Sequence, residues 1–140
     1  MNVEVNQVAV LLAAVSSMVV GSVWYLPNVF GDSWAKLAKV KLESMRSGNL
    51  AWLYGSVFVA SLVTAFVLAH VSYLAHQFFH NSFLSDSLQT AFWLWLGFTA
   101  TRIYVHDAFE SRRKKLTLLN AAHELFTVLV MALIIGSMGY

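Results

Sequence analysis

The chain has 140 residues, of which 59% are hydrophobic and only 11% are charged, and its formal net charge is +2. A soluble domain of this size carries roughly a quarter charged residues, so the composition excludes an ordinary soluble fold and favours an integral membrane protein. The basic residues flank hydrophobic segments, which indicates membrane topology and not nucleic-acid binding, and the absence of cysteine excludes disulfides, thiolate metal sites and cysteine nucleophiles.

Four hydrophobic segments are long enough to cross a bilayer, which takes about 20 apolar residues. They cover residues 5–26, 50–73, 88–109 and 116–138. The first ends before Pro27, the only proline, because proline cannot continue a helix. The residues before it include Glu4 but no Lys or Arg, which favours a retained helix over a cleaved signal peptide. We expect one all-α domain over residues 1–140, an integral membrane four-helix bundle.

The connections between these spans differ in charge. Residues 30–47 contain Trp34 and four basic side chains, and we expect a short interfacial helix there, after the first span. Residues 76–87 contain no Lys or Arg. A basic turn at 111–115 joins the last two spans as an antiparallel hairpin. Because eight of the nine Lys and Arg lie in the first and third connections, the positive-inside rule places both in the cytoplasm and both termini outside.

Polar residues inside the last two spans are the strongest candidates for a functional site. Arg102 and Glu124 lie in hydrophobic segments, where an unpaired charge costs several kcal/mol. If the hairpin folds about Arg113, Arg102 faces Glu124 at the same depth. In that register two more polar pairs face each other, His106 with Asn120 and Thr99 with Thr127. Helical spacing puts each set on one stripe, and we call these six residues the hairpin polar cluster.

Two interpretations of this cluster stay open. In the first, the polar residues hold the two helices together, and Arg102 extends toward the cytoplasmic face along its apolar stem. In the second, they line a polar cavity for a small anion or a proton path, because ionisable groups inside membranes are candidate sites by default.

Three histidines lie near the outer end of the second span, at positions 70, 76 and 80. His70, His76 and His80 are weak candidates for a metal or haem site, because Asp86 is the only acidic residue near them. We therefore expect no metal and no cofactor. The chain has no phosphate loop, dinucleotide fingerprint, nucleophile elbow or zinc-protease motif, so we do not expect an enzyme.

Small residues at helical spacing indicate close packing of helices or a dimer face. They are Ala13, Ser17 and Gly21 in the first span, Ser56, Ala60 and Thr64 in the second, and Ala132 and Gly136 in the fourth. Besides the lipid bilayer, the partners we expect are further copies of this chain or other membrane proteins.

Three short motifs resemble a known family. They are Gly21-Ser22-Val23-Trp24-Tyr25-Leu26-Pro27 continuing to Phe30-Gly31 and Trp34, then Trp95-Leu96-Gly97-Phe98, and then Phe109-Glu110-Ser111-Arg112. The combination resembles the bacterial four-helix membrane proteins known as domain of unknown function 1761, over most of the chain. This resemblance implies four spans in a bacterial cytoplasmic membrane and brings no established activity.

The resemblance also marks individual residues. Those matching the first motif are Trp24, Tyr25, Pro27, Gly31 and Trp34, and those matching the last are Glu110 and Arg112. They form either an interfacial anchor and helix exit or a cytoplasmic mouth or docking surface. The family pattern has Gly between the Glu and the Arg, and often Pro after them, where this chain has Ser111 and Arg113.

The function we expect first is that of a non-enzymatic membrane protein, an oligomeric scaffold or accessory subunit of a membrane complex. The alternative is a channel or transporter for a small solute, an anion or protons that uses Arg102 and Glu124. A third possibility is metal or haem binding at the outer histidines.

Overall fold

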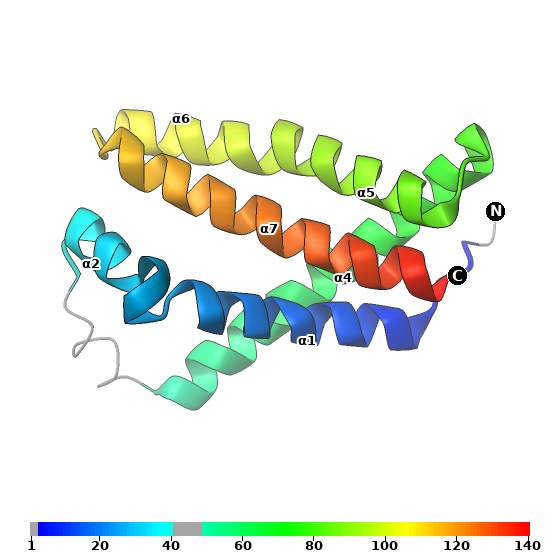
Figure 1. Ribbon diagram of the computed structural model, residues 1–140, viewed down its shortest axis with the longest axis horizontal. Helices are drawn as coiled ribbons and strands as arrows, with labels where there is room; N and C mark the ends of the chain where they lie inside the picture. Colours follow the sequence, from blue (N-terminus) through cyan, green and yellow to red (C-terminus); the bar gives the residue numbers. More distant parts are fainter. Residues whose placement is uncertain (1–2, 41–48) are drawn as a thin grey trace.

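The computed structural model describes residues 3–40 and 49–140, and these ranges are helical without a strand, as expected. The longest helices are α1 (Gln7–Trp24), α4 (Leu50–Phe79) and α7 (Lys114–Met138). Shorter elements connect them: η1 (Pro27–Gly31), α2 (Asp32–Ala38), α5 (Phe83–Leu94), η2 (Trp95–Ala100) and α6 (Thr101–Phe109). Because α5, η2 and α6 follow one another without a gap, they form one rod, which runs lengthwise beside α7, with α1 on the other side of α7 (Figure 1).

Polar side chains determine where several helices begin. Asn6, Asn49 and Ser82 precede α1, α4 and α5, and each side-chain oxygen accepts a hydrogen bond from a backbone N–H of the first turn. Such caps pair donors that have no partner within the helix. Pro27 occupies the first position of η1, where its missing N–H is tolerated.

Within the described residues, α1, α4 and α7 are long and apolar enough to cross a membrane. They match three of the predicted spans, 5–26, 50–73 and 116–138. The helix α4 continues beyond the second predicted span to Phe79 and ends at His80, which has the left-handed φ of 57°. The two helices α4 and α5 are therefore connected by residues 80–82 alone. Near the end of α4, Nδ1 of His76 lies 3.0 Å from the Asp86 carboxylate of α5.

The third predicted span, 88–109, lies in the α5–η2–α6 rod and is not one α-helix. Residues 95–100 form a π-helical segment, in which each turn holds more residues than an α-helical turn. The indole N–H of Trp95 donates a hydrogen bond to the Ala121 carbonyl of α7 at 2.9 Å. The segment shifts the helical phase of α6 relative to α5, and a prediction that assumes uniform α-helix misses that shift.

The surface helix predicted over 30–47 is described only up to Val40. Residues 32–38 form α2, which ends at Lys39 in the left-handed conformation, with a φ of 56°. The remainder of the prediction, with Lys41, Glu43 and Arg46, lies outside the described residues.

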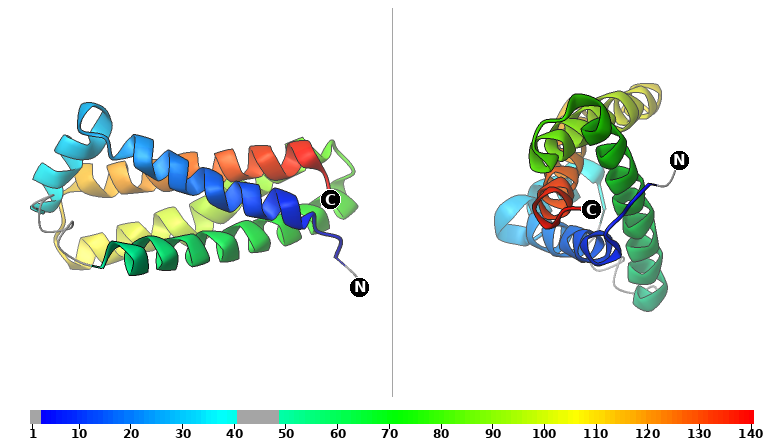
Figure 2. Two further views of the ribbon diagram at one scale, coloured as in Figure 1. Left: turned by 90° about the horizontal axis from the view of Figure 1, so that it is seen from below. Right: turned by 90° about the vertical axis from the view of Figure 1, so that its right-hand side faces the viewer.

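The two ends of the molecule differ in charge. The α2 helix and the α6–α7 turn lie at one end, which we call the basic end (Figures 1 and 2). Its described basic residues are Lys36, Lys39, Arg112, Arg113, Lys114 and Lys115. The opposite, terminal end holds both chain termini and the α4–α5 connection (Figure 1).

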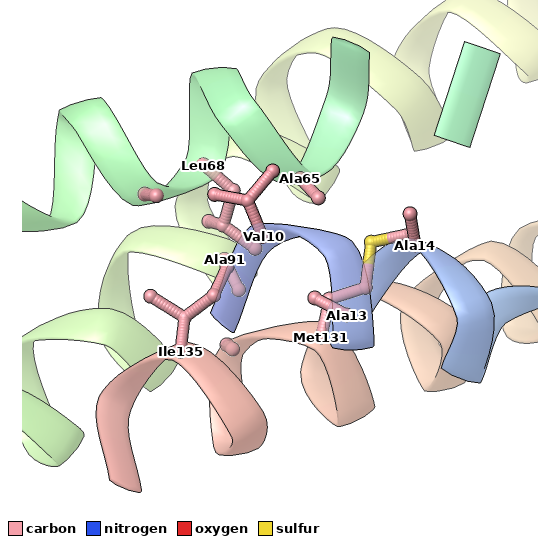
Figure 3. Packing of buried hydrophobic residues seen from close by; sticks show 10 residues of the cluster. Val10, Ala13, Ala14, Ala65, Leu68, Ala91, Met131 and Ile135 are labelled. Carbon is pink, nitrogen blue, oxygen red and sulfur yellow. The ribbon is translucent and has the colours of Figure 1, made fainter. Parts of the chain in front are cut away.

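The buried apolar core lies in the half of the molecule nearest the terminal end, and Figure 3 shows its side chains from close by. It consists of Val10, Ala13 and Ala14 of α1, Ala65, Leu68 and Ala69 of α4, Ala91 of α5, and Met131, Ala132 and Ile135 of α7. Alanine and glycine let the helix backbones approach closely. A Cβ added to Gly136 would lie 2.7 Å from the Cα of Leu84, so α7 and α5 touch directly. By contrast, the predicted small residues of α4, at 56, 60 and 64, are exposed.

Candidate functional site

A cavity of about 510 Å³ lies between α2, α6, α7 and the C-terminal end of α1, and we call it the polar cavity. It lies in the half of the molecule nearest the basic end, which we call the basic half. Five members of the hairpin polar cluster line it: Thr99, Arg102, His106, Asn120 and Glu124. Tyr25 and Trp34 of the first motif complete one wall, and His123 lies beside Glu124. Thr127, the sixth member, is buried elsewhere, and its hydroxyl has no hydrogen-bond partner among the described residues.

The predicted ion pair between Arg102 and Glu124 is not formed. Across residues 3–40 and 49–140, no nitrogen of Arg102 lies within 4 Å of a Glu124 oxygen. A Glu124 carboxylate oxygen lies instead 3.6 Å from Nδ1 of His123. The other two predicted pairs are also not hydrogen-bonded within the part of the chain that the structure describes. The cluster therefore shares a cavity without forming a ladder of pairs.

A shift of register accounts for this difference. Asp107 accepts a hydrogen bond from the Thr117 hydroxyl at 2.6 Å. The predicted register places Leu119 opposite Asp107, so the observed pairing lies two residues closer to the turn. This shift moves Arg102 away from the position opposite Glu124.

Asp107 is a site residue that the prediction left out of the cluster. Its carboxylate is buried and lies 3.7 Å from Nε of Arg112, whose backbone N–H donates to the Asp107 carbonyl at 2.9 Å. Arg112 also pairs with the carboxylate of Glu110. The last family motif thus closes the α6–α7 turn through Arg112. The polar residue Thr117, on the other side of that turn, is the feature of the sequence that could have predicted a partner for Asp107.

His123 connects the first family motif to α7. Its ring centroid lies 5.5 Å from that of Trp24 and 5.1 Å from that of Tyr25. The Nε2 of His123 and the indole nitrogen of Trp24 are buried without a hydrogen-bond partner among the described residues. They are exceptions to the rule that buried polar atoms in proteins are usually paired. The contacts of His123 depend on how α1 packs against α7, which its position in the sequence does not show.

Gly31 explains how the first motif turns back on itself. A Cβ added there would overlap the carbonyl oxygen of Tyr25 and lie 2.9 Å from that of Leu26, so glycine alone fits. The turn brings the Trp34 ring to 5.3 Å from the Tyr25 ring, centroid to centroid, in an edge-on arrangement. The first motif therefore builds a wall of the polar cavity.

A second cavity, of about 490 Å³, lies between α2 and the α6–α7 turn, and we call it the basic cavity. Lys39, Arg112 and Arg113 line it together with Leu37 and Leu116. Trp34 borders both cavities. The first and last family motifs thus meet at the basic end.

The outer histidines do not gather into one site. His70 Nδ1 lies 2.9 Å from the Phe66 carbonyl oxygen of its own helix, and His76 Nδ1 lies 3.0 Å from the Asp86 carboxylate. His80 ends α4. Over residues 3–40 and 49–140, no group of three His, Cys, Asp or Glu is placed to hold a metal ion.

Asp86 is the most buried carboxylate that the structure describes, with 2% of the residue exposed. Burial raises the pKa of this carboxyl group, but hydrogen bonds from Asn81 and His76, together with the charge of His76, outweigh that effect. The pKa of Asp86 is therefore held below its ordinary value.

Comparison with known proteins agrees with the motifs. No curated protein and no solved structure matches the chain at a significant level. The family model described as protein of unknown function (DUF1761) matches residues 8–136, which include both cavities and all three motifs. The chain therefore belongs to this family, as its motifs predicted.

Proposed function

We propose that this protein is a non-enzymatic, four-span protein of a bacterial cytoplasmic membrane that binds a small solute carrying both a negative and a positive group. The observation that carries the proposal is that Arg102 and Glu124 line one cavity without pairing with each other. Opposite charges attract strongly in a medium of low dielectric constant, so their separation leaves each one available to a ligand.

The membrane arrangement rests on three apolar helices and on the position of the charges. In this proposal residues 88–109 of the α5–η2–α6 rod are the fourth span, added to the candidate spans α1, α4 and α7. Basic residues of two distant connections lie at the same end (Figure 1). This supports a cytoplasmic basic end, α2 at the interface, and both termini outside.

Cysteine labelling tests this topology directly, because the chain has no cysteine of its own. We expect Ser82→Cys, in the outer connection, to react with an impermeant maleimide in intact spheroplasts, and Lys115→Cys to react only after lysis. The reverse pattern would overturn the proposed orientation.

The chemistry of the polar cavity favours a zwitterion. Arg102 presents a planar guanidinium that suits a carboxylate or phosphate group, and Glu124 presents a carboxylate that suits an ammonium group. His106 and Asn120 add hydrogen-bonding groups to the same lining. The volume of about 510 Å³ lies within the range typical of small-molecule sites.

A fluorescence titration tests the binding, because Trp34 lines the cavity. Glycine and phosphoethanolamine are the zwitterionic probes, and acetate and methylammonium carry one charge each. We expect only zwitterions to change the fluorescence, and Arg102→Gln and Glu124→Gln each to weaken binding about tenfold, since a charge-assisted hydrogen bond contributes about 1.5 kcal/mol. Lys115→Gln, outside the cavity, is the control. Equal binding of acetate to the wild type would point to a plain anion site.

An oligomeric scaffold or accessory subunit is the second candidate function. The first half of α4 leaves large apolar side chains uncovered by any described helix, including Trp52, Val59 and Val63. Either lipid or another protein covers this face in the membrane. A companion protein at constant stoichiometry after mild detergent purification would support this function. A lone chain that carries zwitterions across liposomes would support a transporter built on the polar cavity.

A further inference from the structure

The basic cavity has a chemistry that differs from that of the polar cavity. Its charged lining is mainly cationic, from Lys39 at the end of α2 and from Arg112 and Arg113 in the α6–α7 turn. The carboxylate of Glu110 also lines it, but Glu110 is paired with Arg112. Lys39 and Arg113 have no carboxylate oxygen within 4 Å among the described residues. The cavity thus carries an excess of positive charge.

The start of α7 adds to this excess. Arg113 is its N-cap residue and makes no side-chain capping hydrogen bond, and the first turn contains no acidic residue. A helix N-terminus carries a partial positive charge and favours an anion. Arg113, which lines the cavity, lies at this N-terminus. An anion in the basic cavity would offset the charge of both.

Apart from Ser111, the remaining residues that line the cavity are apolar. Leu116 is buried, and Leu37 and Trp34 are partly buried beside it. A small hydrated anion gains nothing from such walls, whereas an amphiphile places its charged group against the cations and its hydrocarbon against the side chains. Basic pockets between helices at the cytoplasmic surface of a membrane bind anionic lipid headgroups by this combination.

We propose that the basic cavity binds the phosphodiester headgroup of an anionic phospholipid, held by Lys39 and Arg113, with the start of its acyl chain against Leu37 and Leu116. This inference uses the cytoplasmic-interface position argued under the proposed function, but it does not involve Arg102 or Glu124. A failure of zwitterion binding therefore leaves it unaffected.

Lipid retention by the purified full-length protein tests the proposal. The protein is equilibrated in mild detergent with phosphatidylglycerol and phosphatidylcholine of identical acyl chains, and bound lipid is measured by native mass spectrometry. We expect preferential retention of phosphatidylglycerol. The double variant Lys39→Gln with Arg113→Gln should lose about 30-fold in that preference, the effect expected for two basic residues at an anionic surface. Should it not fold, Arg113→Gln alone should lose about fivefold.

A matched control distinguishes a specific site in the basic cavity from a general attraction of anionic lipid to the positive charges of the basic end. Lys36→Gln with Lys115→Gln removes the same charge from the same end but from outside the cavity lining, and it should keep the preference. Equal losses in both double variants, or no preference in the wild type, would overturn the proposal. Displacement of the lipid by millimolar glycerol phosphate would also overturn it, because the cavity would then be a site for a free phosphate ester.

Discussion

The two halves of the molecule are built on different principles. In the terminal half, alanines and Gly136 bring helix backbones into direct contact, and a buried carboxylate has its hydrogen bonds satisfied. In the basic half, a π-helical segment and a tight glycine turn hold polar and aromatic side chains around two cavities. Dense packing supplies stability, so the first half keeps the helices together and the second is free to hold charges that a packed core excludes. The comparison predicts that substitutions act most strongly on stability near the termini.

The largest effect is expected at Gly136. An added methyl group meets the backbone of Leu84, which cannot move aside without separating α7 from α5. We expect Gly136→Ala to lower the free energy of unfolding by about 3 kcal/mol, at the upper end for overpacking, as measured by SDS titration in mixed micelles. Gly55→Ala is the matched control, because nothing lies within 4 Å of that position, and it should be neutral or stabilising by up to about 1 kcal/mol. Equal behaviour of the two variants would contradict the close contact.

The next largest loss of stability is expected in the basic half, at Gly31. Gly31→Ala forces the chain apart at the Tyr25 carbonyl, and we expect a loss of about 2 kcal/mol. The contact between Trp34 and Tyr25 should be lost as well, which changes the near-ultraviolet circular dichroism. Gly97→Ala, with no neighbour within 4 Å, should leave that spectrum unchanged. A larger loss of stability at Gly31 than at Gly136 would reverse the proposed division between the halves.

Stability measured as a function of pH tests the contribution of Asp86, the hydrogen-bonded carboxylate of the terminal half. Because the folded pKa of Asp86 lies below its ordinary value of 3.8, the ionised form stabilises the fold at neutral pH. That contribution is fully present above the unfolded pKa and is lost as the pH falls through the folded pKa. Asp86→Asn should therefore lose about 1 to 2 kcal/mol at pH 7 and show a flatter stability profile below pH ~4. Asp32→Asn, at an exposed position, should follow the wild-type profile.

The two halves also differ in how well the sequence predicts their structure. Hydropathy located α1, α4 and α7, and the small residues at 13, 132 and 136 marked real helix contacts. These features are local or periodic, so a single sequence contains them. The span 50–73 ends before α4 does, because hydropathy locates the apolar part of a helix and not its last turn.

The candidate site was harder to predict. Five of the six cluster residues do line one cavity, because stripes on adjacent helices must face each other. Their pairing was wrong, since the contact between Asp107 and Thr117 across the turn lies two residues from the predicted register. The aromatic partners of His123 come from a distant segment, so its place on α7 alone does not identify them.

The smallest predicted effect is a gain in stability from a substitution in the basic half. Ser111 has a φ of 52°, in the left-handed region that favours glycine, and its backbone N–H donates to the Ala108 carbonyl. Glycine adopts this conformation without the steric cost of a Cβ, so the turn already has the geometry that glycine prefers. We expect Ser111→Gly to raise the free energy of unfolding by about 0.5 to 1 kcal/mol, as measured by the same SDS titration. Ser56→Gly, on the exposed face of α4, should lower it by a similar amount, because glycine is unfavourable within a helix. A loss of stability at both positions would mean that the Ser111 side chain stabilises the turn in a way its backbone geometry does not show. The basic half would then tolerate substitution less well than the contrast between the halves requires.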